Sequence, residues 1–495
     1  MRMKQSILIW GCLLWSSALL PAAESYNLDL QGSLDIAINR SYKMRTLKEN
    51  LLQAGYELKA ATSRFKTQVD LDLKIPNYTE TMRNFEDSLG VHYFPVKQAA
   101  YSSNLVIRQP LPTDGSIDLS SGFYTLEDYY RRRNSIQLNT RLRITQPLEA
   151  FYSYNRIKST LRQAQLHFEL SRKQLSRSTL DLNYEVGQAF YGLVSANERE
   201  KIAEQTLRVQ EEAYHLAQNK YKAGVIAEVE ALQMEVDYGE AQNSYDIAVA
   251  NRRSQANYLK QLLGINLADT VRVDYDLSYQ VVAVDAEQAV ALGLKNRLEI
   301  REKEISAELS EIDIRRTRAD GRITGSISAY YDFIGIGEDD RNIALSRTFD
   351  KTWQNLSDRP GNKGVSLDIS IPIWDWGVNR AQVKAAEAGL RKARYTLENE
   401  KVSVERDIRD TVTQLKSSLK RLHLLEKNVA VAEKSFEISK NRFSNGDINS
   451  QSLALDRNRL SQAYVSRLEA YISYKLLLAD LARKTFYDYE NDRVL

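Results

Sequence analysis

Two long stretches of this chain contain no proline, and each follows a strand-like segment that ends at one. Pro147 precedes the first stretch, which runs to residue 359, and Pro372 is the last proline of the sequence. A proline inside a helix costs about 3 kcal/mol, so its absence favours uninterrupted helices. We predict long helices over 149–221 and 375–443, about 110 Å and 100 Å in length. Helices of globular domains are far shorter on average, so this part of the chain cannot be a compact domain.

The two stretches are copies of one plan. Gly224 and Gly446 end the two predicted helices, and the sequences before them align without a gap. The aligned positions recur in alternating steps of four and three, the spacing of a coiled-coil seam. They pair Ala203, Leu207, Gln210, Tyr214, Ala217 and Tyr221 with Leu425, Val429, Ala432, Phe436, Ser439 and Phe443. A second gapless match aligns the region around Ile36 and Val69 with that around Val290 and Ile323.

These matches divide the chain into two tandem repeats, 24–270 and 284–485, followed by a tail over 486–495. In the first repeat we expect a helix, strands within 66–147, the long helix 149–221 and a returning helix 230–263. In the second we expect a helix over 286–318, strands within 322–373, the long helix 375–443 and a returning helix 452–484. The predicted fold class is therefore mainly α with membrane β, each repeat contributing long coiled-coil helices and two strands.

The predicted strands alternate strictly between apolar and polar residues. Ser135–Thr145, Gly364–Ile373 and Arg322–Tyr331 all show this pattern. Nine to eleven residues suit a tilted strand in a membrane, although a soluble sheet with one wet face alternates in the same way. The attached helices favour the membrane, and so few strands cannot close a barrel alone. Open strand edges cannot lie in lipid, so several copies must pool their strands.

Two regions between the strands leave alternatives open. The first barrel strand, somewhere between 66 and 126, is either Val69–Ile75, which the repeat aligns, or Ile117–Phe123, which also alternates. Gln109–Gly115 contains two prolines and a glycine and is a predicted turn. Asp332–Asn362 is polar, and we expect it to be an exposed loop.

The composition excludes several classes of protein. Residues 1–23 have a basic start, an apolar run and small residues at the end, which predicts a signal peptide. Cys12, the single cysteine, lies inside it, and the alternative is a lipid-attachment cysteine. The rest of the chain is nearly neutral, which argues against nucleic-acid binding. Four scattered histidines predict no metal site, and no phosphate-binding or nucleophile motif is present, so we expect neither a cofactor nor an enzyme.

Three short segments resemble the TolC-like outer-membrane efflux proteins. They are Tyr221–Val225 with Glu230–Gln233, Phe443–Asp447, and Ile371–Gly377 at the start of the second long helix. The resemblance implies a homotrimer in the outer membrane of a Gram-negative bacterium, in contact with its lipid. It also implies a 12-stranded barrel continued by an α-helical periplasmic tunnel. The implied partners are a periplasmic adaptor and an inner-membrane RND or ABC pump.

The same resemblance places the functional residues at the two helix turns. It implies adaptor docking at Ala223, Gly224 and Val225 and at Asn445, Gly446 and Asp447. It places the periplasmic entrance at Glu230, Phe443, Asp447, Ser452, Leu455 and Asp456. Some family members close this entrance with a tyrosine, an arginine and aspartates, where this chain has Phe443, Ile448, Ser452 and Leu455. Our hypothesis is that closure here depends on packing and on Glu230, whose other interpretation is a first-turn acid favoured by the helix dipole.

The predicted function is a passive exit duct of a tripartite efflux or type I secretion system. The alternative is a periplasmic coiled-coil adaptor or structural protein that does not span the membrane. The sequence leaves the cargo open, since drugs, metal ions, lipids and proteins all pass through ducts of this kind. It also leaves open the particular pump and adaptor.

Overall fold

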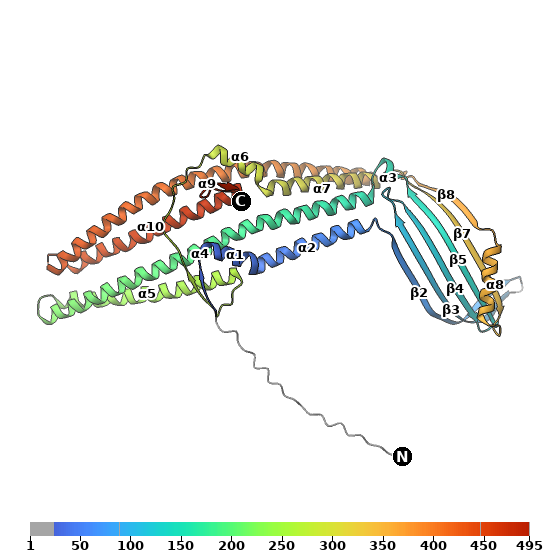
Figure 1. The fold of residues 1–495 in the computed structure, drawn as a ribbon, viewed down its shortest axis with the longest axis horizontal. Coiled ribbons are helices and arrows are strands. Elements are labelled where there is room, and N and C mark those ends of the chain that lie inside the picture. The colour runs from blue at the N-terminus through green and yellow to red at the C-terminus, as the bar shows by residue number, and fades with distance from the viewer. Residues whose placement is uncertain (1–23, 89, 446, 495) are drawn as a thin grey trace, which may run out of the picture.

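The structure, a computed structural model, describes residues 24–88, 90–445 and 447–494. The predicted signal peptide, Cys12 and Gly446 lie outside the described residues. Long helices form one end of the molecule and a curved sheet forms the other (Figure 1). In chain order the elements are β1 (Ser25–Leu28), α1 (Leu30–Arg40), α2 (Tyr42–Ser63), β2 (Gln68–Asp87), β3 (Gly90–Pro110), β4 (Ser116–Asp128), β5 (Arg133–Pro147), α3 (Glu149–Tyr152), α4 (Arg156–Lys222), α5 (Glu228–Leu263), β6 (Thr270–Val273), α6 (Ala286–Asn296), α7 (Leu298–Asp320), β7 (Thr324–Asp340), α8 (Leu345–Asp358), β8 (Asn362–Ser370), α9 (Val378–Asn445), α10 (Ser450–Thr485), β9 (Tyr487–Asp488) and β10 (Arg493–Val494).

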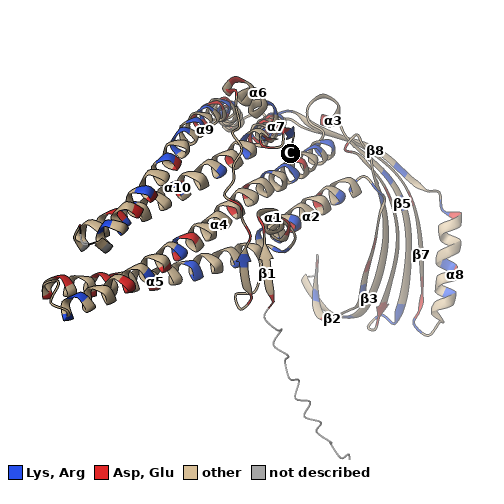
Figure 2. Cartoon of the chain, turned by 60° about the vertical axis from the view of Figure 1, so that its left-hand side comes forward, with Lys and Arg blue, Asp and Glu red and all other residues tan. Residues whose placement is uncertain are grey.

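Two helical hairpins dominate the molecule. Helix α4 has 67 residues and α9 has 68, about 100 Å each, and both return through helices of 36 residues, α5 and α10. Each repeat also carries a shorter pair of helices that packs beside its hairpin, α1 and α2 in the first, α6 and α7 in the second. Lys, Arg, Asp and Glu are spread along these helices (Figure 2). No helix among the residues that the structure describes is both long and apolar enough to cross a bilayer.

The helix boundaries differ from the predictions where side chains cap the backbone. The first long helix does not begin at 149, because Asn155 is extended and its side chain accepts a hydrogen bond from the backbone N–H of Lys158 (2.9 Å). The short helix α3 precedes this break. The second long helix begins at Val378 because Trp376 and Gly377 have positive φ angles of 54° and 81°. The predicted helix 286–318 is interrupted at the extended Arg297, which separates α6 from α7.

The sheet has six strands rather than the four that we predicted. Its order is β2-β3-β4-β5-β7-β8, and every neighbouring pair is antiparallel. The first repeat therefore contributes four strands and not two, and both candidates for its first strand are strands, Val69–Ile75 within β2 and Ile117–Phe123 within β4. The expected loop from Asp332 to Asn362 was also wrong, since β7 continues to Asp340 and α8 follows it.

The register of the sheet separates its two faces. Leu142 pairs with Leu119 on one side and with Tyr331 on the other, and these side chains share a face. That face is mainly apolar, and its apolar side chains are Val69, Leu71, Leu73, Leu105, Ile107, Ile117, Leu119, Phe123, Ile136, Leu138, Leu142, Ile144, Ile327, Ala329, Tyr331, Phe333, Val365, Leu367 and Ile369. Polar residues on the same face include Ser103, Ser121, Thr125, Glu127, Asn134, Thr140, Gln146 and Asp339. The opposite face is polar, and on it Arg141 donates to the buried carboxylate of Asp332 (2.6 Å). The sheet therefore has one mainly apolar face and one polar face.

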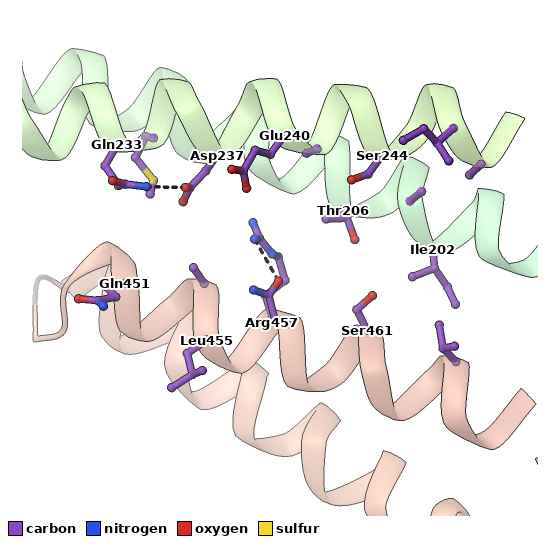
Figure 3. Close-up of a pocket in the computed structure, with 18 of the residues that line it drawn as sticks. Ile202, Thr206, Gln233, Asp237, Glu240, Ser244, Gln451, Leu455, Arg457 and Ser461 are labelled. Atoms are coloured by element: carbon purple, nitrogen blue, oxygen red, sulfur yellow. Dashed lines mark hydrogen bonds between the residues drawn. The ribbon is translucent and has the colours of Figure 1, made fainter. Parts of the chain in front are cut away.

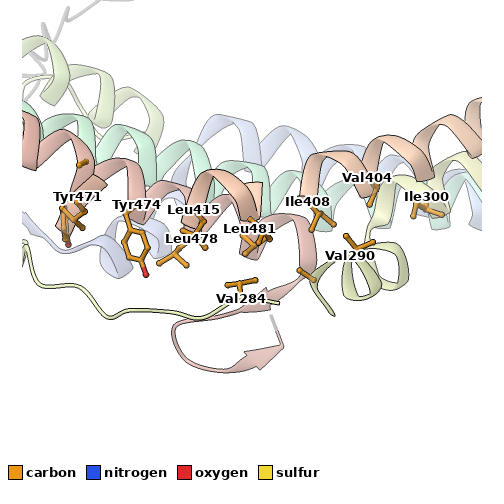
Figure 4. Packing of buried hydrophobic residues seen from close by; sticks show 14 residues of the cluster. Val284, Val290, Ile300, Val404, Ile408, Leu415, Tyr471, Tyr474, Leu478 and Leu481 are labelled. Atoms are coloured by element: carbon orange, nitrogen blue, oxygen red, sulfur yellow. The ribbon is translucent and has the colours of Figure 1, made fainter. Parts of the chain in front are cut away.

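The helices pack around two apolar cores near the middle of the molecule. The core of the first repeat joins α1, α4 and α5, and that of the second joins α6, α9 and α10 (Figure 4). Tyr474 of α10 has no exposed surface in the second core. Its hydroxyl donates to the carbonyl of Gln280 (2.8 Å) and accepts from the backbone N–H of Val282 (3.2 Å). The hydroxyl of Tyr471, also buried on α10, donates to the carbonyl of Asp276 (2.8 Å), so two buried tyrosines fix the linker between the repeats to α10.

We expect Tyr474→Phe to lower the free energy of unfolding by about 1–3 kcal/mol, because the N–H of Val282 loses its partner. Thermal unfolding followed by circular dichroism in detergent measures this. The matched control is Tyr464→Phe, whose hydroxyl donates to Glu433 (2.6 Å) at an exposed site. Equal effects of the two substitutions would contradict the role of Tyr474.

Candidate functional site

The turn between α4 and α5 is fixed by two backbone hydrogen bonds. The N–H of Gly224 donates to the carbonyl of Tyr221 (2.8 Å), and that of Val225 donates to the carbonyl of Lys220 (2.9 Å). This pair of bonds is a Schellman motif, which needs a left-handed residue after the helix. Gly224 has a φ of +71° and supplies it. Ala223, Gly224 and Val225 are exposed at this tip.

The turn between α9 and α10 repeats the outer of these two bonds. The N–H of Asp447 donates to the carbonyl of Arg442 (2.9 Å), at positions 222 residues after Val225 and Lys220. Asn449 then caps α10, since its side chain accepts from the backbone N–H of Ser452 (3.0 Å). The hydroxyl of Ser452 donates to the same side-chain oxygen (2.8 Å), so Ser452 belongs to the cap. Asn445 and Asp447 are exposed.

A groove lies between the two hairpins next to their tips. It encloses about 1020 Å³ and is bounded by α4 and α5 on one side and α10 on the other (Figure 3). Glu230 and Leu455 both line it, although 225 residues separate them in the sequence. Glu230 is in the first turn of α5, together with Glu228. The structure thus brings two of the predicted entrance residues to one groove.

Arg457 of α10 is a charged residue of this groove that the sequence analysis missed. Its side chain points from α10 towards Asp237 and Glu240 of α5 (Figure 3). Its Nε atom is buried without a hydrogen-bond partner. Burial lowers the pKa of Arg457, and the carboxylate of Asp237 acts in the opposite direction. The groove therefore contains a partly desolvated cation that faces acidic side chains of the other hairpin.

Two further entrance residues, Phe443 and Asp456, contact neighbouring helices instead of lining this groove. The ammonium group of Lys220 lies 5.0 Å from the centre of the Phe443 ring, which links α4 to α9 at the tips. Asp456 accepts a hydrogen bond from the hydroxyl of Ser439 (2.5 Å) and pairs with Arg459 (3.1 Å), so it faces α9. Neither Phe443 nor Asp456 lines the groove between the hairpins.

Both lateral edges of the molecule are open. Strands β2 and β8 each pair on one side only. Beyond β2, helix α2 exposes large apolar side chains, and beyond β8, helix α9 does the same. They are Tyr42, Leu52 and Tyr56 on α2, and Val378, Tyr395, Val402, Leu424, Val431 and Ile438 on α9. A chain with this architecture, an amphipathic sheet with open edges that continues into long helical hairpins, is one wall segment of a larger channel.

The comparisons with known proteins agree with this class. A sequence profile described as "Outer membrane efflux protein" matches residues 34–265 and 292–483. The chain belongs to the outer membrane efflux protein family. Among individual proteins, it is 22% identical over 337 residues to outer membrane protein TolC of Escherichia coli, an alignment that covers 65% of this chain and 64% of TolC.

Solved structures share the fold over almost the whole chain. The CmeC outer membrane channel of Campylobacter jejuni aligns with a TM-score of 0.68 and 14% identity, over 92% of this chain and 85% of CmeC. The MtrE outer membrane channel of Neisseria gonorrhoeae, in its open state, aligns with a TM-score of 0.64 and 16% identity, over 92% of this chain and 88% of MtrE. The family and these neighbours are channel proteins rather than enzymes. The protein is an outer-membrane protein that extends into the periplasm.

Within the described residues, no group of three or more His, Cys, Asp or Glu side chains could hold a metal ion.

We expect Gly224→Ala to destabilise the first tip by about 1–2 kcal/mol, because an L-residue must then adopt the left-handed conformation. Hydrogen exchange at the amide of Val225 measures this and should become faster. Gly239→Ala is the matched control, since Gly239 lies inside α5 and, like Gly224, has open space where a Cβ would be added. That control should stabilise α5 by about 0.5–1 kcal/mol. Unchanged exchange in Gly224→Ala would show that the tip does not depend on glycine.

Proposed function

We propose that this protein is the passive exit duct of a tripartite efflux or type I secretion system. One observation carries the proposal, namely that a sheet with an apolar outer face continues directly into helices about 100 Å long. Three copies would join β8 of one subunit to β2 of the next, and their helices would form a tunnel into the periplasm. Because each sheet has six strands, the proposed trimer has eighteen barrel strands, instead of the twelve that we expected from the sequence.

The helix tips are the proposed contact with a periplasmic adaptor. Ala223, Gly224 and Val225 form one tip. Asn445 and Asp447 lie at the other, and the proposed contact also includes Gly446, which is between them in the sequence. Support comes from exposure and rigidity, since Val225 presents 69% of its surface at the end of a turn with two backbone bonds. An inner-membrane RND or ABC pump would supply the energy, because a duct of this kind performs no chemistry.

The entrance is proposed to lie inside these tips, at Glu230, Phe443, Asp447, Ser452, Leu455 and Asp456. Closure by packing is supported by Leu455 in the groove and by the contact of Lys220 with Phe443. To the sequence hypothesis we add Arg457, whose charge attracts Asp237 and Glu240 across the groove. A partner that separates α10 from α5 would widen this passage.

The alternative, a periplasmic adaptor that does not span a membrane, is not favoured. A protein that stays in water does not need a sheet whose mainly apolar face carries strongly exposed side chains. Leu71, Val365 and Leu367 expose 60%, 79% and 56% of their surfaces on that face. In water this area would favour aggregation, whereas in lipid it is the expected surface of a barrel.

A crosslinking experiment tests the proposed trimer. Cysteines introduced at Val69 in β2 and Ile369 in β8 lie near the helical ends of the two open edges. With a bis-maleimide reagent, we expect covalent dimers and trimers and no larger species. The purified trimer should form pores in a planar bilayer. A control pair at Leu119 and Leu138, inside one sheet, should give no product between subunits. A monomer without conductance would refute the proposed function.

The entrance hypothesis has its own prediction. Replacing Glu230 by Ala should reduce the cation preference of the closed channel, because three carboxylates leave its narrow end. Conductance and reversal potential in planar bilayers measure this. Glu235→Ala is the control, since Glu235 is exposed on α5 but does not line the groove. If the two variants behave alike, Glu230 is only a first-turn acid of α5.

A further inference from the structure

Helix α8 is an unexpected element at the end of the sheet farthest from the long helices. Its fourteen residues, Leu345–Asp358, lie between β7 and β8. Its axis runs across the long axis of the molecule in both views (Figures 1 and 2). The contacts pass from Leu356 at Gly335 to Thr348 at Gly337, so α8 runs alongside the last part of β7 and antiparallel to it.

The inner side of α8 is built to lie directly on the apolar face of the sheet. Gly335 and Gly337 of β7 share that face with Phe333, and an added Cβ at them would lie 2.4 Å and 2.7 Å from backbone oxygens of α8. Thr348 and Thr352 are fully buried in this contact. The sequence analysis assigned these two glycines to a loop. In the structure they allow α8 to pack directly against β7.

Polar contacts fix the position of α8. The side chain of Asn355 accepts a hydrogen bond from the backbone N–H of Ile336 (3.0 Å). This part of β7 has no neighbouring strand on the edge that faces β8, because β8 begins opposite Asp332. Lys351 pairs with Asp339 of β7. These contacts hold helix α8 in a fixed position against β7.

One flank of α8 remains apolar and uncovered. Leu345, Phe349 and Trp353 follow each other at four-residue steps and expose 45%, 40% and 58% of their surfaces. The rings of Phe349 and Trp353 stack at 6.5 Å. Arg347 and Gln354 lie on the opposite flank of the helix, as the helical period requires. A helix with one apolar aromatic flank and one charged flank suits the boundary between acyl chains and head groups.

A second aromatic pair lies at the other end of β8. Trp374 and Trp376 expose 74% and 87% of their surfaces, with ring centres 5.5 Å apart. The nine residues of β8 lie between them and α8, about 30 Å along the strand. With the usual strand tilt, this matches an apolar band about 25 Å tall between two aromatic girdles.

We propose that α8 is an interfacial helix that binds outer-leaflet lipid, with Leu345, Phe349 and Trp353 inserted at the boundary of acyl chains and head groups. The proposal rests on the proposed function, because it requires the sheet to be inserted in the membrane. The continuity of this flank with the apolar face of the sheet identifies the occupant as lipid. The helix then anchors the outer rim of the channel, as Trp374 and Trp376 anchor the periplasmic rim.

Tryptophan fluorescence tests the proposal directly. Outside residues 1–23, the sequence has tryptophan only at positions 353, 374 and 376. The double variant Trp374→Phe/Trp376→Phe reports on Trp353 alone. We expect its trimer in phosphatidylcholine vesicles to show blue-shifted emission. Lipids brominated near the head group should quench this emission more than lipids brominated near the bilayer centre. Red-shifted emission that aqueous iodide quenches and brominated lipid does not would overturn the proposal.

Two controls separate this result from other failures. Trp353→Phe reports on the periplasmic girdle, so if its emission is also insensitive to brominated lipid, the sheet itself is not inserted and the proposed function fails. If only Trp353 is insensitive, the proposal for α8 fails alone. In the single-tryptophan background, Phe349→Ser should weaken quenching of Trp353 by brominated lipid. Arg347→Ser, on the opposite flank, should leave it unchanged.

Discussion

Backbone hydrogen bonding is the constraint on which this structure depends. A strand in lipid has no water to satisfy its N–H and C=O groups, so each must find a partner strand. Strands β3, β4 and β5 have a neighbouring strand on both sides within one chain, and β7 has one as far as Asp332, whereas β2 and β8 pair on one side only. The apolar face makes water equally unsuitable for the sheet. A single chain therefore cannot form a closed barrel. The unpaired edges of β2 and β8, rather than any side chain, require it to assemble with further copies.

The helical half depends on a different constraint, namely the burial of apolar side chains along helices of great length. Its two cores lie near the middle of the molecule, where short helices add a further layer to the hairpins. Towards the tips the hairpins lose that layer, and the groove between them contains polar and charged residues. Stability is thus concentrated in the middle, and the ends of the helices are the part that can move apart at low cost.

The features that the sequence predicted are those encoded locally. The long helices, the alternating strands and the left-handed glycine at 224 follow from proline, periodicity and turn chemistry within a few residues. The features that the sequence analysis did not predict depend on contacts between residues far apart in the sequence. The glycines at 335 and 337 were interpreted as loop residues because nothing nearby in the sequence shows that a helix covers them. Arg457 was missed because its acidic neighbours lie on α5, more than 200 residues earlier. The number and bounds of the extra strands in the first repeat could not be predicted, since the second repeat has no counterpart with which to align them.

The shortness of the helix turns has a thermodynamic consequence. Only five residues connect α4 to α5, and two backbone hydrogen bonds already fix their conformation. A flexible loop must be ordered when it binds, at a cost of about 0.5–1.5 kcal/mol for each immobilised side chain. A turn that is ordered in advance avoids most of this cost. Weak contacts over a small area can therefore suffice for recognition, and such an association can form and dissociate rapidly.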